Sequence, residues 1–191
     1  MAPNASIQIR HPTLGVCGLS CLLCPRHQSA AASRCEGCKT PSRLGAACSM
    51  QTCALKKQKV EYCGLCCMSK SCPKWANHRE AGRKHDSFVS YGKLEENIAL
   101  IQQNGVSAWE RLELKKERLL RMLLAEYDEG RSKNYLCLAV TLLRFEDLKA
   151  AMEEEKRNRP AQSDLKSRSI AIHAVLDRMA EKTKAILALR K

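Results

Sequence analysis

The stretch CGLSCLLCP, residues 17–25, places three thiols within eight positions and follows the last of them with a proline. Thiolates three or four positions apart can bind one soft metal ion without distorting the backbone. Two further pairs with this spacing follow, Cys35/Cys38 and Cys63/Cys66, and eleven of the twelve cysteines lie between residues 17 and 72. The clustering predicts metal coordination and makes the cysteines the organising feature of the N-terminal half.

A disulfide framework is the alternative explanation for this cysteine density. Residues 1–10 lack the basic and then apolar pattern of an export signal, and the longest apolar run, Tyr135–Leu143, is far shorter than the roughly 18 residues of a membrane span. We therefore expect a cytoplasmic protein with no membrane partner. In a reducing cytosol, closely spaced cysteines are more often metal ligands than disulfides.

The composition changes near residue 92 of the 191-residue chain. Residues 1–92 carry 13 lysines and arginines against 4 acidic residues, whereas residues 93–191 carry 20 against 16. Part of the net charge of +13 would offset the negative charge of metal-bound thiolates. The change predicts two domains, a cysteine-rich metal-binding domain over 1–92 and a helical domain over 93–191.

The first of these domains is poor in long apolar side chains and rich in Gly, Pro and Ser. Such a segment buries too little surface to offset its chain entropy, so we expect metal binding to supply much of its folding energy. Two short helices are predicted. One covers about 47–57, and the other begins at Pro73, which suits the first helical turn, and runs to about Lys84.

The second half has helical signals throughout. Ser107 and Glu110 have capping-box spacing and Gly130 resembles a C-terminal cap, which predicts one long helix between them. Further helices are expected over 132–143 and 145–156, then a polar break over 157–163 and a long last helix over 164–190. The predicted fold class is a small α-rich, two-part protein: an irregular, metal-stabilised N-terminal domain followed by an α-helical, bundle-like half.

Two features of the helical half concern packing. Cys137 lies among apolar residues, which predicts a buried core cysteine and not a ligand. The last helix carries an apolar stripe that must be covered, either by the preceding helices or by a partner helix or a second copy of the chain, so a homo-oligomer through 164–190 is possible. The stripe consists of Leu165, Ile172, Leu176, Met179, Ile186 and Leu189.

Ten cysteines are the candidate metal ligands, and no residue is a candidate for catalysis. They are Cys17, Cys21, Cys24, Cys35, Cys38, Cys48, Cys53, Cys63, Cys66 and Cys72. Two four-coordinate sites need fewer, and the spacing leaves open which thiols share a site. Cys67 is the weakest candidate of its cluster because adjacent side chains diverge, and His78 and His85 are more typical of a solvated helix face.

The spacing leaves the metal open between zinc and a 4Fe-4S cluster. Pairs such as Cys35-Glu-Gly-Cys38 are typical of four-cysteine zinc sites, since small residues between the ligands let backbone amides face the sulfurs. The triad of 17–25 with its proline, and a second Cys-Pro pair at Cys72-Pro73, are typical of iron–sulfur ligation. Zinc is the leading prediction.

These motifs together resemble a known family. The series Cys17-Gly-Leu-Ser-Cys21-x2-Cys24-Pro25, Cys35-x-Gly-Cys38-Lys39, Cys48-x4-Cys53-Ala54 and Cys63-Gly-x-Cys66 to Cys72-Pro73 is similar to the cysteine-rich "domain of unknown function 3795" family of bacteria and archaea, over roughly residues 15–80. The resemblance implies a small metal-binding module, commonly zinc-binding, without an established activity. The helical second half departs from relatives that continue into a further cysteine-containing ribbon.

The sequence shows no nucleotide-binding glycine loop, no Gly-x-Ser-x-Gly elbow and no His-Glu-x-x-His motif, which favours a non-enzymatic role. The leading hypothesis is a metal-binding module that contacts a protein partner. The first alternative is an iron–sulfur protein for electron transfer or redox sensing. The second is nucleic-acid binding through a basic patch with Trp75 beside it, whose members are Lys56, Lys57, Lys59, Lys70, Lys74, His78, Arg79, Arg83 and Lys84.

Overall fold

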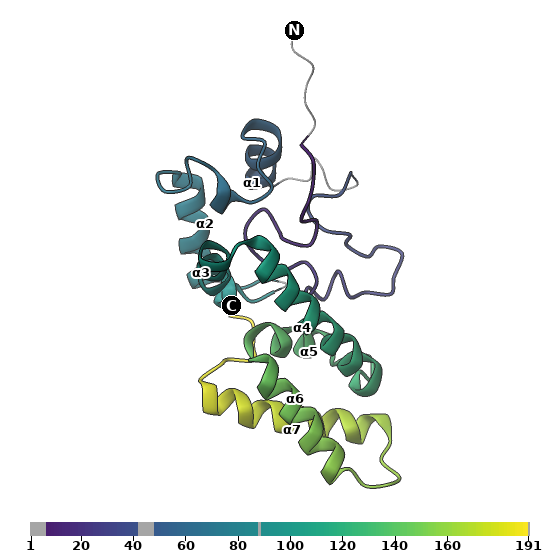
Figure 1. The fold of residues 1–191 in the computed structure, drawn as a ribbon. Coiled ribbons are helices and arrows are strands. Elements are labelled where there is room, and N and C mark those ends of the chain that lie inside the picture. Colours follow the sequence, from purple (N-terminus) through teal and green to yellow (C-terminus); the bar gives the residue numbers. More distant parts are fainter. Residues whose placement is uncertain (1–6, 42–47, 88, 191) are drawn as a thin grey trace.

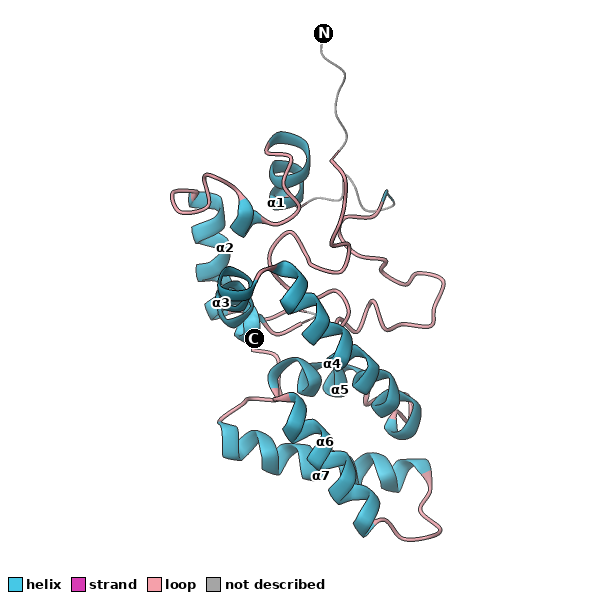
Figure 2. Ribbon diagram, in the orientation of Figure 1, coloured by secondary structure: helices cyan, strands magenta, loops and turns pink. Residues whose placement is uncertain are grey.

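The computed structural model describes residues 7–41, 48–87 and 89–190. Over these ranges the chain forms helices and loops and no strand, apart from an isolated antiparallel bridge between Leu14 and Ser20 (Figure 2). The α-rich fold class is confirmed. The elements are α1 (Ser49–Gln51), the π-helix η2 (Thr52–Lys57), the 3-10 helix η3 (Cys63–Leu65), α2 (Pro73–Lys84), the 3-10 helix η4 (Tyr91–Lys93), α3 (Leu94–Asn104), α4 (Val106–Tyr127), α5 (Lys133–Leu142), α6 (Phe145–Asn158) and α7 (Leu165–Thr183).

The irregular loops and the helices α6 and α7 occupy different ends of the molecule. Figure 1 shows the irregular N-terminal segment at the end opposite to α6 and α7, with α4 running between the two ends. The helix predicted from Pro73 is confirmed as α2, with proline in its first turn. The helix predicted over 47–57 is a short α-helix continued by a π-helix, and its first expected residue, Ala47, lies outside the described residues.

The helical half is held together by one apolar core between α4, α5, α6 and α7. Cys137 is 1% exposed within it, as predicted, and Leu23 of the N-terminal segment also joins it. Its buried members are Leu23, Leu119, Leu120, Leu123, Tyr127, Leu136, Cys137, Ala139, Val140, Leu143, Leu148, Ala151, Met152, Ile172, Val175, Leu176 and Ala180. The apolar residues recur along one face of each of these helices because that face packs into this shared core.

A second core joins the cysteine-rich segment to α3 and the start of α4. Its buried members are Leu14, Val16, Leu19, Met50, Ala54, Leu55, Tyr62, Trp75, Leu94, Ile98, Ile101, Val106 and Trp109. Polar contacts follow the same route: Asn97 Nδ2 donates to the Gly18 carbonyl at 3.1 Å, and Glu110 accepts from Thr13 at 3.0 Å. Packing therefore continues across residue 92, where the composition changes.

Several helix boundaries differ from the prediction: α4 ends at Tyr127, before the expected cap at Gly130, and α6 continues to Asn158, two residues into the expected polar break. With Ser107 as its cap, the long helix would begin at Ala108. It begins at Val106 instead, because Gly105 ends α3 and starts α4 at φ 80°, ψ 163°. Ser107 therefore lies inside α4, and Glu110 accepts from Thr13 in place of forming a capping box. The helix α3 itself was not predicted.

The last helix is shorter than the expected 164–190. It ends at Thr183, because Lys184 takes the left-handed conformation at φ 56° and the amide of Ala185 bonds back to the Ala180 carbonyl at 2.9 Å. The chain then returns to α2, where Arg190 donates to the Gly82 carbonyl at 3.2 Å. The apolar stripe therefore divides: Ile172 and Leu176 are buried, whereas Ile186 is 67% exposed.

Candidate metal centre

The first cysteine loop is a tight turn closed by its own backbone. The amide of Gly15 bonds to the Leu19 carbonyl at 2.8 Å, and Gly18, at φ 88°, bonds back to Gly15 at 2.9 Å. A Cβ at Gly15 would lie 3.3 Å from Cys17 Sγ. Glycine therefore leaves room for the sulfur inside the turn.

Cys21 of this loop meets Cys38 of the next cysteine pair. The Cys21 thiol donates a hydrogen bond to the Cys38 sulfur, and this bond, helped by the Val16 amide and the Lys39 cation, lowers the pKa of Cys38 to about 6 against the effect of burial. The same bond raises the pKa of Cys21. The hydrogen bond between these two thiols, distant in sequence, therefore favours the deprotonated form of Cys38.

A buried ion pair holds the cysteine loops together. Lys39 Nζ donates to the His11 carbonyl at 2.8 Å and to Glu61 Oε2 at 3.2 Å, and the Lys39 side chain has no exposed surface. Glu61 also accepts from the amides of Arg10 at 2.6 Å and His11 at 2.9 Å. Because Lys39 follows Cys38 and Glu61 precedes Cys63, this ion pair draws the second and third cysteine pairs toward each other.

Cys63 lies among several other sulfurs. Its amide bonds to the Val16 carbonyl at 3.0 Å, which fixes η3 beside the first loop. Burial, together with the nearby thiols of Cys17, Cys53, Cys72 and Cys66, raises the pKa of the Cys63 thiol to about 12. Burial is likewise the main cause that raises the pKa of Cys17 to about 12, with smaller contributions from Cys38 and Cys48.

Eight of the ten predicted ligands act on one another's pKa. The first thiol group is defined as Cys17, Cys21, Cys38 and Cys48, because Cys38 and Cys48 raise the pKa of Cys17, and Cys38 and Cys17 raise that of Cys21. The second thiol group is defined as Cys53, Cys63, Cys66 and Cys72, because the other three raise the pKa of Cys63. Cys17 has a larger charge effect on the pKa of Cys63 than any of these three, so the two groups adjoin and are not separate. All twelve cysteines are free thiols.

The remaining predicted ligands lie elsewhere. Cys24 is close enough to Cys137 of α5 to raise its pKa, although burial is the larger cause, and the carbonyl of Cys35 pairs with His27 Nδ1 at 2.8 Å. Cys67 is exposed. Among the residues that the structure describes, no three Cys, His, Asp or Glu side chains stand ready to hold a metal ion.

An aromatic platform that sequence reasoning missed supports the second thiol group. The buried ring of Tyr62 meets Trp75 edge-on at 5.9 Å, and Trp75 stacks on His78 at 5.8 Å. A Cβ at Gly64 would lie 2.5 Å from the Tyr62 ring, so only glycine fits between Cys63 and Leu65. His78 is thus part of a ring stack, and burial lowers its pKa; His85 is exposed.

The predicted basic patch is partly paired with carboxylates. Arg79 binds Glu95 through two hydrogen bonds, one of them 2.8 Å long, and Arg83 lies 3.1 Å from Glu80. Lys84 also reaches Glu80 at 3.1 Å. The lysines that lie outside α2 are exposed, namely Lys56, Lys57, Lys59 and Lys70.

No family model matches the chain, and neither a curated protein nor a solved structure matches it. The resemblance to the domain of unknown function 3795 family therefore stays a prediction that rests on the cysteine motifs. Within the described residues, no helix has both the length and the apolar character needed to cross a membrane.

Proposed function

We propose that the chain is a non-enzymatic metal-binding module whose cysteine-rich segment, residues 1–92, is braced by zinc and contacts a protein partner in the cytoplasm. The observation that carries the proposal is the density of free thiols, since eleven of the twelve lie between residues 17 and 72, and we assign eight of them to the two thiol groups. Four thiolates complete the coordination of one zinc ion, and such closed sites are structural because no position remains for a substrate.

The donor chemistry fits zinc. Thiolates are soft ligands, and at Cys38 the hydrogen bond from Cys21 and the cation of Lys39 already favour the deprotonated form that zinc requires. The Val16 amide faces the Cys38 sulfur, as amides do in zinc knuckles. Bound zinc would supply cross-links between loops that have few regular hydrogen bonds, with the first thiol group at one ion and the second at another.

The helical half and the loops would together present the surface that a partner contacts. Leu65 and Met68, in the loop of the second thiol group, are 57% and 52% exposed. Apolar side chains exposed on a metal-braced loop are typical of a protein contact more than of a nucleic-acid contact, which relies on cations and aromatic rings. The ion pairs of Arg79, Arg83 and Lys84 also leave the basic patch with less charge for phosphates.

Metal analysis tests this proposal. The protein is purified anaerobically without chelators, and zinc, iron and acid-labile sulfide are measured per chain together with the visible spectrum. We expect about two zinc ions and a colourless sample. Iron with matching sulfide would overturn zinc in favour of the iron–sulfur alternative, and a metal-free, folded protein would overturn metal binding altogether.

Paired variants then test the grouping. Cys63→Ser removes a member of the second thiol group and should lower the zinc content by about one ion per chain. Cys67→Ser is the matched control, because this neighbouring cysteine is exposed and belongs to neither group. Equal zinc loss in both variants would contradict the assignment of the second thiol group.

A further inference from the structure

A cavity of about 740 Å³ lies apart from the two thiol groups. Four segments of the chain line it: the loop from Leu23 to Ser33, Ser87 and Val89 after α2, α5 from Lys133 to Thr141, and the C-terminal residues 187–189. Cavities of about 300 to 1,000 Å³ are the usual size for sites that bind small organic molecules. The metal-binding proposal makes no use of this space.

The lining combines an apolar wall with cationic groups. Leu23, Leu138, Leu187 and Leu189 provide the apolar surface, and small polar side chains such as Ser29, Ser33 and Asn134 stand among them. The charged side chains of the described lining are Lys133 and Arg26, and Arg26 also has another interaction within the chain. No carboxylate is present among the lining residues that the structure describes. An occupant with a negative charge and an apolar body complements this lining.

The start of α5 adds to the positive character. Lys133, Asn134 and Tyr135 form its first turn and line the cavity, and no side chain caps this helix. The Ser132 hydroxyl, at the N-cap position, instead bonds Glu129 at 2.6 Å and Ser169 at 2.8 Å, and the Ser132 amide donates to Asp128 Oδ1 at 3.1 Å. The first amides of a helix without a cap carry partial positive charge and need acceptors.

The C-terminal segment makes the cavity a preformed site. After α7 the chain returns to α2, where Arg190 Nε lies 3.3 Å from Asp86 Oδ2 and its guanidinium donates to two carbonyls at the end of α2. Leu187 packs against the helical core on its way. Because both ends of this segment are held, the wall that it forms stands without an occupant.

We propose that this cavity binds a small organic anion with an apolar body, whose carboxylate or phosphate group pairs with Lys133 and the first amides of α5. The apolar part of the ligand lies against the leucine wall. The site is independent of the metal, so its failure would leave the function proposed above untouched.

Amide chemical shifts of the zinc-containing full chain test the site, with octanoate, octyl phosphate, octylammonium and acetate as probes. We expect saturable shifts at 133–135 and 187–189 with at least one of the two octyl anions, and none with octylammonium or acetate. Tighter binding of octanoate would indicate a carboxylate ligand, and tighter binding of octyl phosphate would indicate a phosphate ligand. Equal shifts with octylammonium, shifts at other residues, or no shift with either anion would overturn the proposal.

Two variants examine the contacts. Lys133→Glu reverses one charge, and since an acidic residue suits a helix start, α5 should remain folded while the anion binds about tenfold more weakly. Lys149→Glu, at an exposed position of α6 away from the cavity, is the matched control and should bind within about twofold of the unaltered chain. Ser33→Trp, at an exposed lining position, fills the space without touching a core and should also abolish binding. Unchanged affinity in Lys133→Glu and Ser33→Trp would exclude this cavity.

Discussion

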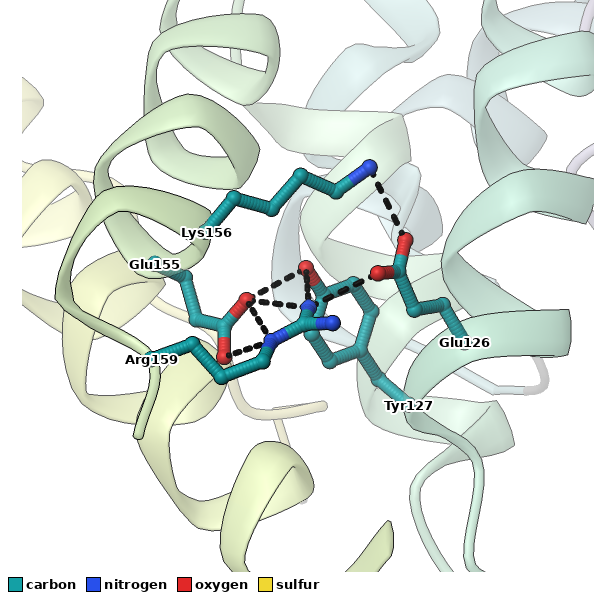
Figure 3. A network of polar contacts seen from close by, with 5 residues as sticks. All are labelled: Glu126, Tyr127, Glu155, Lys156 and Arg159. Carbon is teal, nitrogen blue, oxygen red and sulfur yellow. Dashed lines mark hydrogen bonds and ion pairs between the residues drawn. The ribbon is translucent and has the colours of Figure 1, made fainter. Parts of the chain in front are cut away.

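The hydroxyl of Tyr127 donates a 2.7 Å hydrogen bond to Glu155 Oε2 and thereby joins α4 to α6 (Figure 3). Tyr127 is 0% exposed and Glu155 is 3% exposed. Arg159 completes the network, with Nη2 at 2.9 Å from the Tyr127 hydroxyl and 2.7 Å from Glu126 Oε1. A buried carboxylate is tolerated here because a cation and a hydroxyl both face it.

Tyr127→Phe should therefore destabilise the helical half by about 1 to 2 kcal/mol, because it removes one donor from a buried carboxylate and leaves the packing of the ring unchanged. The free energy of unfolding in urea measures this loss. Tyr135→Phe is the matched control, since its hydroxyl bonds Asp177 at an exposed position and should cost much less. Equal losses in the two variants would show that burial of the network adds nothing.

Lys39→Met should cost about 3 kcal/mol, because it leaves the largely buried carboxylate of Glu61 without its cation and frees the His11 carbonyl. Thermal unfolding of the zinc-containing chain measures the change. Lys84→Met removes an exposed ion pair with Glu80 and should leave the midpoint unchanged. A Lys39→Met protein as stable as the unaltered chain would mean that the ion pair does not hold the cysteine loops together.

Gly18→Ala should destabilise the chain more than Gly105→Ala does. Both glycines have positive φ, at 88° and 80°, so both substitutions carry a backbone cost of about 1 kcal/mol. A Cβ at Gly18 would also lie 3.1 Å from Leu94 Cδ1 and 3.2 Å from the Tyr62 ring, whereas nothing stands within 4 Å of Gly105. Urea unfolding of the two variants separates the steric part from the conformational part, and similar losses would contradict close packing at Gly18.

The sequence predicted helices well where the local signal agreed with the packing. Pro73 marks the start of α2 because a proline ring suits the first turn, and Cys137 lies in an apolar run that becomes core. The predicted range of the last helix was too long, because the apolar pattern continues past Thr183 while the backbone turns at Lys184. Nothing in the local pattern marks that turn, since Lys184 is neither glycine nor asparagine.

The spacing of the cysteines leads to a prediction of ligand types, which stays a prediction, but it cannot predict which thiols come together. Which thiols come together depends on contacts between distant segments, such as Lys39 with Glu61 and the Cys63 amide with the Val16 carbonyl. Lys39 directly follows Cys38, and Glu61 stands two residues before Cys63. This placement was a visible sign of the link. The aromatic stack of Tyr62 and Trp75 had no such sign, because an isolated aromatic residue in a loop-rich segment does not show its partner.

Acidification should weaken the α5–α7 contact through His173. Its ring stacks on Tyr135 at 3.8 Å, and burial lowers its pKa, although the carboxylates of Asp177 and Glu129 partly oppose this. The unfolded chain therefore binds a proton more readily than the folded chain, so the free energy of unfolding falls as the pH drops below about 6.5.

The comparison of the unaltered chain with His173→Gln isolates this contribution from the carboxylates and thiols, which titrate in both proteins. Unfolding in urea at about pH 7.5 and about pH 5.5 gives, for each protein, the free energy of unfolding that is lost on acidification. We expect the loss on acidification to be smaller in the variant. An identical loss would place the pH dependence in other groups.

Removal of the metal should loosen one end of the molecule and leave the other intact. The cysteine loops are joined by few backbone bonds, so without zinc the segment around Cys17 and Cys63 should exchange its amide hydrogens quickly. The helices α5, α6 and α7 have their own apolar core and should keep their protection. Hydrogen exchange before and after treatment with a zinc chelator measures both.

Because α3 and the start of α4 share a core with the cysteine loops, their protection should fall with that of the loops. Unaltered protection of Ile98 and Trp109 would show that this shared core is stable without the metal.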